Sequence, residues 1–362
     1  MFVSTEHRAM AETEKQKRMY PLRFGKIEKE QAWGRETVAL SDLGIADSVA
    51  EGGWLDGNSL GDIMETYLDR VTGEKPYYFF GRQFPLMVRT LDVDGKMPLL
   101  VCPDDTVAGE RFDSLGKAKL WYVLDAKEGA GIVEGFSRDV TASELYAIAT
   151  GSGQKMTVPD SSVLNIVVPK KGDAIRISPG TVHCAFGKVR ILEIAESSGL
   201  DIEIWNWGEA MDAEELGVVE ALDFINLGKH KPLPAVFQPE GAAEGTRQLA
   251  MQDEFRVAEI DLSNPMHVFP SESDLYLIYT CIRGSICLEE ERPGGKESLV
   301  ADAGDTVLVP AEVKDIVLMP RESGTVLLES TSGDRKEKDE YIDESVPAQI
   351  DGEDYDEDPI KI

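Results

Sequence analysis

The side chains best suited to chemistry in this chain gather around one histidine. His183 follows a turn formed by Pro179 and Gly180, which lets its side chain point into the fold. Such a histidine can contact a substrate or carry a proton, or it can simply form hydrogen bonds with its neighbours. Cys102 could add a thiolate, whereas Cys184 should point to the opposite face if the chain is extended there. Because a divalent ion usually needs three or four protein ligands, we expect no metal or other cofactor.

Several cations accompany this histidine in the sequence. Arg89, Lys117 and Lys171 are candidate contacts for a phosphate group, and ordinary solvation is the alternative for each. Asp104 and Asp105 follow Pro103, where their carboxylates most simply accept hydrogen bonds from turn amides.

These residues lie on or beside short predicted strands joined by Gly, Pro and Asp turns, a pattern typical of a jelly roll or barrel. We predict an all-β fold with short helices at Asn58–Leu68, Thr141–Thr150 and Ala213–Leu227. The strand candidates are Leu86–Leu91, Pro98–Cys102, Leu120–Leu124, Gly131–Glu134, Ser162–Val168, Asp173–Ile177, Val189–Ala195 and Ile202–Trp207.

The phrase that leads to His183 recurs later in the chain. PKKGDAIRISPGTVH is matched by AGDTVLVPAEV, which again places a strand between a Gly-Asp turn and a proline. Glu312 or Val313 occupies the place of the histidine there. We therefore predict two barrels, at 19–230 and 231–330, with a flexible leader at 1–18 and an acidic tail at 331–362.

The formal net charge of −30 makes nucleic acid and anionic membrane surfaces unlikely partners. Residues 331–362 hold twelve acidic and four basic side chains, so most of the excess lies on the body. The chain has no apolar run of about 18 residues and no signal-peptide core, which predicts a cytoplasmic protein. Its four cysteines then favour free thiols, and the oligomeric state stays open.

Longer motifs carry a family resemblance. FGRQFPLMVRTLDV, the PDD of VCPDD, GK-x-x-x-WYV, VPKKGDAIRISPGTVH, LEI-x-x-SSG and the Trp of WNWG stand in this order between residues 79 and 208. Together with YPLRFGKIEKEQAWG near the start, they resemble the class I mannose-6-phosphate isomerases. That resemblance implies two cupin barrels, the first with the active site, and an enzyme of carbohydrate metabolism.

The resemblance also implies a zinc or similar ion held by a Gln, two His and a Glu. Leu100 stands at the Gln position, Cys102 at the first His, Lys119 at the Glu, and only His183 matches. Leucine cannot bind a metal, and an ammonium repels one. Glu203 replaces the family arginine that is thought to assist catalysis, and ETVALS at 36–41 is a reduced form of another family segment.

Three readings of function follow from these departures. The first is a non-zinc, catalytically degenerate member, a pseudoenzyme, that binds a sugar or phosphosugar through Arg89, Lys117, Lys119 and His183. The second is an active isomerase of mannose 6-phosphate and fructose 6-phosphate, with an altered metal set or with His183, Glu203 and Lys119 as acid–base groups. The third is a structural or interaction protein whose site is filled by its own side chains. In that interior Lys119 could pair with Glu203 or another carboxylate, and otherwise it would be an exposed strand lysine.

Overall fold

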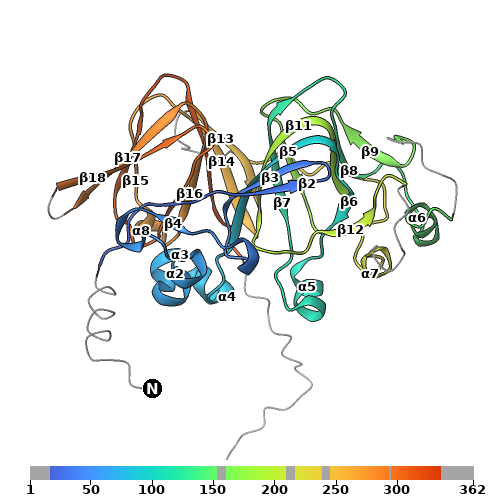
Figure 1. The fold of residues 1–362 in the computed structure, drawn as a ribbon, viewed down its shortest axis with the longest axis horizontal. Helices are drawn as coiled ribbons and strands as arrows, with labels where there is room; N and C mark the ends of the chain where they lie inside the picture. The colour runs from blue at the N-terminus through green and yellow to red at the C-terminus, as the bar shows by residue number, and fades with distance from the viewer. Residues whose placement is uncertain (1–16, 153–159, 209–216, 239–244, 293–294, 336–362) are drawn as a thin grey trace, which may run out of the picture.

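The computed structural model describes residues 17–152, 160–208, 217–238, 245–292 and 295–335. Strands dominate these residues and curl into two barrels that lie side by side (Figure 1). This arrangement confirms the predicted all-β, cupin-like fold with short helices.

The first barrel is a ten-stranded sheet built around one long strand, β11 (His183–Glu196). β11 pairs with β5 along eleven residues on one side, and on the other side with β7 and then β8. Such a strand holds its neighbours in one register, so the residues at its two ends have fixed positions. The other strands of this sheet are β2 (Ile27–Gln31), β3 (Gly34–Leu40), β5 (Leu86–Lys96), β6 (Leu99–Val101), β7 (Lys119–Ala126), β8 (Gly131–Phe136), β9 (Leu164–Val167), β10 (Ala174–Ile177) and β12 (Ile202–Trp205).

The second barrel combines a seven-stranded and a four-stranded sheet. The larger sheet contains β1 (Leu22–Phe24), β4 (Ala50–Glu51), β13 (Thr246–Met251), β14 (Phe255–Leu262), β16 (Leu277–Arg283), β19 (Thr306–Val309) and β21 (Thr325–Ser332). The smaller sheet contains β15 (Met266–Val268), β17 (Ser285–Arg292), β18 (Gly295–Asp302) and β20 (Ile316–Pro320).

The N-terminal strands cross the boundary that we predicted between the barrels. β1 pairs with β19 and β4 pairs with β1, so both belong to the sheet of the second barrel, although they precede the first barrel in the chain. Lys26 also forms an ion pair of 2.8 Å with Asp305. The predicted division at residue 230 therefore needs a correction. It followed the order of the chain, whereas the pairing of β1 and β4 with strands of the second barrel depends on the tertiary structure.

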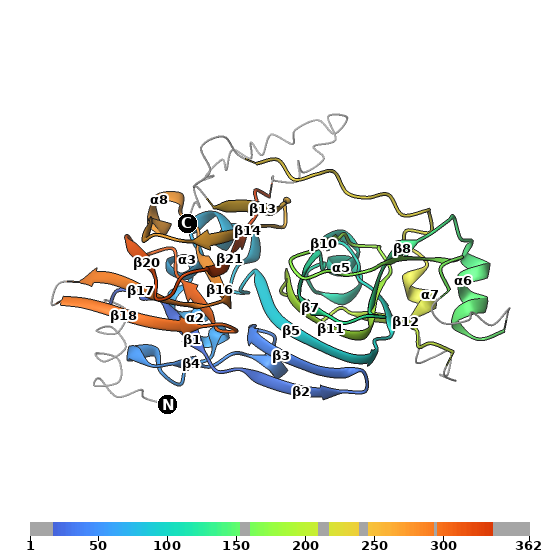
Figure 2. The same cartoon turned by 90° about the horizontal axis from the view of Figure 1, so that it is seen from above.

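The two barrels share an apolar core. Phe84 before β5 and Tyr276 before β16 are fully buried, and their ring centroids lie 4.8 Å apart. The same cluster includes Leu86 and Leu192 of the first sheet and Leu328 of the second. Figure 2 shows from above that β5 starts next to the second barrel and then curves away from it around the first.

Short helices fill the remaining connections. Ser59 caps α2 (Leu60–Tyr67) and Thr141 caps α6 (Ala142–Ala149), each by accepting a hydrogen bond from a first-turn amide, which confirms two predicted helices. The others are α3 (Asp69–Thr72), α4 (Glu74–Phe80), α5 (Asp105–Phe112), α7 (Val218–Ala221), α8 (Pro270–Ser273) and the 3-10 turns η1 (Gly44–Ala46) and η2 (Gly53–Leu55).

One turn prediction is confirmed and one helix prediction needs correction. Asp104 and Asp105 accept from the backbone amides of Val107 and Gly116 as predicted, and the turn continues into α5. The predicted helix at 213–227 is reduced to Val218–Ala221 in the described residues, and 213–216 lie outside them.

The predicted termini fall mostly outside the described residues, which exclude 1–16 and 336–362. Within the predicted tail, Thr331 and Ser332 end β21, so the second barrel continues beyond residue 330. Arg335 forms ion pairs with Asp105 and Glu196 of the first barrel. None of the helices in the described residues is long and apolar enough to span a membrane.

Candidate functional site

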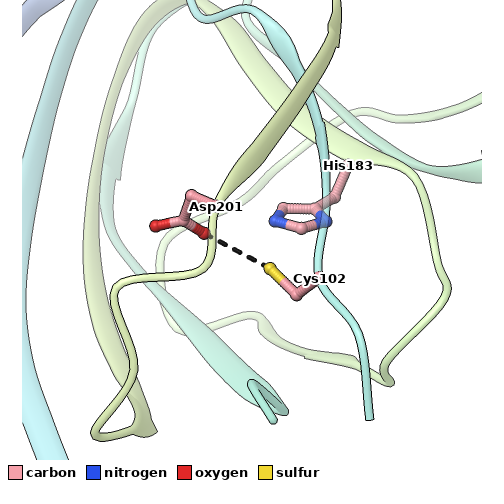
Figure 3. A group of neighbouring side chains, drawn as sticks. All are labelled: Cys102, His183 and Asp201. Carbon is pink, nitrogen blue, oxygen red and sulfur yellow. Dashed lines mark hydrogen bonds between the residues drawn. The ribbon is translucent and has the colours of Figure 1, made fainter. Parts of the chain in front are cut away.

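The predicted site residues come together at one end of the first barrel's interior. His183 begins β11 and lies opposite Leu100 of β6. Lys119 begins β7, Cys102 follows β6, and Asp201 directly precedes β12. Figure 3 shows Cys102, His183 and Asp201 facing one another across the site. Strand ends thus bring together residues that lie up to 99 positions apart in the chain.

Lys119 stands at the centre of this group and is fully buried. Its ammonium donates to Nε2 of His183 at 2.9 Å and forms an ion pair with Asp201. A second carboxylate, that of Glu193, lies 3.7 Å away. The reading of an exposed strand lysine is therefore wrong, because the side chain points into the barrel.

Two further cations complete a buried ion network. Arg89 of β5 binds Glu193 at 2.6 Å, Asp201 at 2.9 Å and Glu36 at 3.2 Å. Lys117 binds Asp201 at 2.7 Å. Because three cations face three carboxylates, their charges balance, which a buried network needs if its desolvation cost is to be offset.

The ion pair between Lys119 and Asp201 holds both groups in their charged forms. Burial by itself would lower the pKa of Lys119, but Asp201, with a contribution from Glu193, raises it above its usual value. Burial would likewise raise the pKa of Asp201, and the cations led by Lys117 and Lys119 hold it well below its usual range. Lys119 and Asp201 are therefore charged at neutral pH, whereas burial lowers the pKa of Lys117.

His183 is neutral in this setting. Burial, assisted by the ammonium of Lys119, lowers its pKa to about 3. Its Nδ1 lies 2.9 Å from the carbonyl oxygen of Thr181, to which it donates, and Nε2 then accepts from Lys119. Both ring nitrogens are engaged, so the imidazole has no lone pair left for a proton or a metal ion.

The other potential metal ligands fit an ion poorly. One ligand atom each of Cys102, His183 and Asp201 lies within 4.8 Å of the others, which is close enough for a shared ion. The ammonium of Lys119, however, is bonded to two of these three. Burial raises the pKa of the Cys102 thiol to about 12, so the thiol keeps its proton. It donates a hydrogen bond of 3.3 Å to the carboxylate of Asp201. A lysine therefore holds the place that an ion would need.

The remaining residues that the sequence singled out lie outside the ion pairs described above. Leu100 is a buried core residue, and Cys184 lies in the apolar core, as its position next to His183 predicted. Glu203 lies in β12 opposite Leu100, and its proposed catalytic role stays a prediction. Lys171 is exposed and borders a cavity between the barrels.

We did not predict Asp201 or Glu193 from the sequence, although both are central to the network. A sign was present, because Arg89, Lys119 and Glu193 all stand inside strongly apolar strands. Charged residues in such strands need buried partners of opposite sign. The ion pairs of Asp201 with these cations could not be predicted, because Asp201 lies in a loop after Gly199 and not in a patterned strand.

Comparisons with known proteins agree with this picture of the fold. No family model matches the chain. A mannose-6-phosphate isomerase of Streptococcus mutans is 25% identical over 235 residues, which span 64% of this chain and 70% of that protein.

Solved structures extend the likeness to most of the chain. The crystal structure of mannose 6-phosphate isomerase from Bacillus subtilis superposes with a TM-score of 0.72 at 22% identity, covering 86% of this chain and 99% of that one. A mutant of phosphomannose isomerase from Salmonella typhimurium gives 0.68 at 14% identity, covering 87% and 100%. Both barrels thus have counterparts in these proteins.

Proposed function

The chain belongs to the mannose-6-phosphate isomerase family of carbohydrate metabolism, and we propose that it is a member without zinc and without the isomerase reaction. One observation carries the proposal. The ammonium of Lys119 is bonded to both His183 and Asp201, at the point where these residues and Cys102 converge.

Electrostatics oppose a divalent ion at this point. An ion would lie beside an ammonium whose pKa is raised, in a buried setting where charge repulsion is screened little. Lys119 already neutralises the carboxylates that would attract the ion. The lysine thus takes over the charge-balancing part of a metal but not its Lewis acidity.

The alternative of metal-free isomerisation finds less support in the geometry. Exchange of a proton between neighbouring carbons needs a base with a free lone pair. His183 has both nitrogens engaged, and Lys119 is held protonated. The active isomerase therefore stays the second candidate.

The burial of the predicted binding residues limits how a sugar or phosphosugar could reach this interior. Arg89, Lys117, Lys119 and His183 are buried and are bonded to other members of the network. The side chains of Asp201 and Arg89 are 19% and 11% exposed. A ligand would thus meet the rim formed by these two residues, which also supports the reading of a filled interior.

Metal content and isomerase activity test the proposal together. We expect purified protein to contain far less than one zinc per chain and to convert no mannose 6-phosphate to fructose 6-phosphate in a coupled assay with added zinc. The Streptococcus mutans relative serves as the positive control. Stoichiometric zinc, or turnover that disappears in His183→Ala, would overturn the proposal.

A further inference from the structure

A second cavity lies between the two barrels, apart from the buried ion network. It has a volume of about 630 Å³, within the range of small-molecule sites. Strands β5, β7 and β11 of the first barrel line one side, and β14, β16 and β19 of the second line the other. Because the barrels share a buried core beside it, the two walls are held in place.

The cavity is lined by four cations and three carboxylates, so its lining has a small net positive charge on a strongly acidic protein. Lys171, Arg190, Arg247 and Arg283 line it. Arg190 is paired with Asp92 at 3.0 Å and Arg247 with Glu259 at 3.0 Å. Lys171 and Arg283 are exposed, and no salt bridge to either is found among the described residues.

Arg283 is held in position without losing its charge. Its Nε donates to the carbonyl oxygen of Gly324, so the two terminal nitrogens remain for a ligand. A planar guanidinium, such as that of Arg283, and an ammonium, such as that of Lys171 on the same cavity, are groups that proteins use to bind phosphate.

Hydroxyl and carboxylate groups line other parts of the wall, together with apolar side chains. The Tyr122 hydroxyl donates to Glu259 at 2.5 Å, and the hydroxyls of Thr280 and Thr306 lie 3.0 Å apart. Asp125 and Asp261 add carboxylates. These acceptors would repel a bare polyanion, but they suit the hydroxyl donors of a polyhydroxylated molecule.

We infer that this inter-barrel cavity binds a small phosphorylated polyhydroxy compound, such as a sugar phosphate, with Lys171 and Arg283 holding the phosphate. The cavity shares no residue with the network of Lys119 and needs no metal. The inference therefore stands or falls independently of the lost isomerase reaction.

Isothermal titration of the full chain with mannose 6-phosphate, mannose and inorganic phosphate tests the site. We expect mannose 6-phosphate to bind, with affinity falling as salt rises, and mannose to bind far more weakly. Lys171→Ala/Arg283→Ala should weaken binding at least about tenfold, since it removes charge-assisted hydrogen bonds. Inorganic phosphate that binds as well as the sugar phosphate would refute the sugar part of the inference.

Two further variants distinguish a general effect of protein charge from an effect of the cavity itself. Arg82→Ala/Lys314→Ala removes the same charge from exposed positions outside the cavity and should leave binding unchanged. Ala303→Trp, at an exposed residue of the cavity wall, should block binding without a change of charge. No binding by the wild type, or equal binding by wild type, Lys171→Ala/Arg283→Ala and Ala303→Trp, would overturn the site.

Discussion

Replacement of Lys119 by methionine probes the central interaction of this protein. Methionine keeps the unbranched apolar stem and removes the ammonium that bonds to His183, Asp201 and Glu193. Arg89 and Lys117 then face three carboxylates, so one negative charge is left buried without a balancing cation.

The expected loss of stability follows from that imbalance. Removal of one partner from a buried ion pair costs about 3–5 kcal/mol. Because Arg89 and Lys117 still bind Asp201, we expect the lower end, about 3 kcal/mol. That is a large part of the roughly 5–15 kcal/mol of a typical native protein, and urea unfolding measures it directly.

Lys117→Met is the matched control for this variant. Lys117 is also buried and binds Asp201 at 2.7 Å, but no contact between Lys117 and His183 is found among the described residues. Both variants should be destabilised. Only Lys119→Met frees Nε2 of His183, so only this variant should acquire zinc through Cys102, His183 and Asp201, with loss of the thiol proton.

Elemental analysis and urea unfolding with and without zinc decide the outcome. Lys119→Met should bind about one zinc per chain and recover stability when zinc is added. If Lys119→Met is as stable as the wild type, the ammonium does not balance the buried carboxylates. If Lys117→Met gains zinc equally well, Lys119 does not hold the place of the ion.

Two further predictions concern the surroundings of the site. Burial, with a contribution from Asp105, outweighs the opposing effect of Arg335 and raises the pKa of Glu196 from 4.5 to about 7, so the folded state holds a proton there that the unfolded chain releases. Stability should therefore fall as pH rises between these values, and Glu196→Gln should flatten that slope by about 1–3 kcal/mol in urea titrations at pH 5 and 7; an unchanged slope would contradict this. Asp104→Ala should cost about 1 kcal/mol through loss of the α5 cap, and Asp104→Asn should cost much less; equal losses would point to another cause.

Local patterns in the sequence were enough for the fold class and for two of the helices. The spacing of strands and turns predicted the all-β fold, and Ser59 and Thr141 marked the starts of two helices. The turn at Pro179 and Gly180 predicted that His183 points inward, because turn geometry depends on a few adjacent residues. The motifs also identified Leu100, Cys102 and Lys119 as departures from the family's metal ligands.

Long-range pairing decided what those departures mean. From the sequence, Lys119 could have been an exposed lysine, a phosphate ligand or the partner of an interior carboxylate, and only the fold identifies Asp201 and Glu193 as its partners. Likewise, β1 joins the second barrel by pairing with β19, which lies almost 300 residues later in the chain, so no local pattern could predict this pairing. Composition and spacing specify which residues are charged or apolar. Which charges meet depends on register and on barrel closure, because a buried ion pair forms between residues that no local pattern connects.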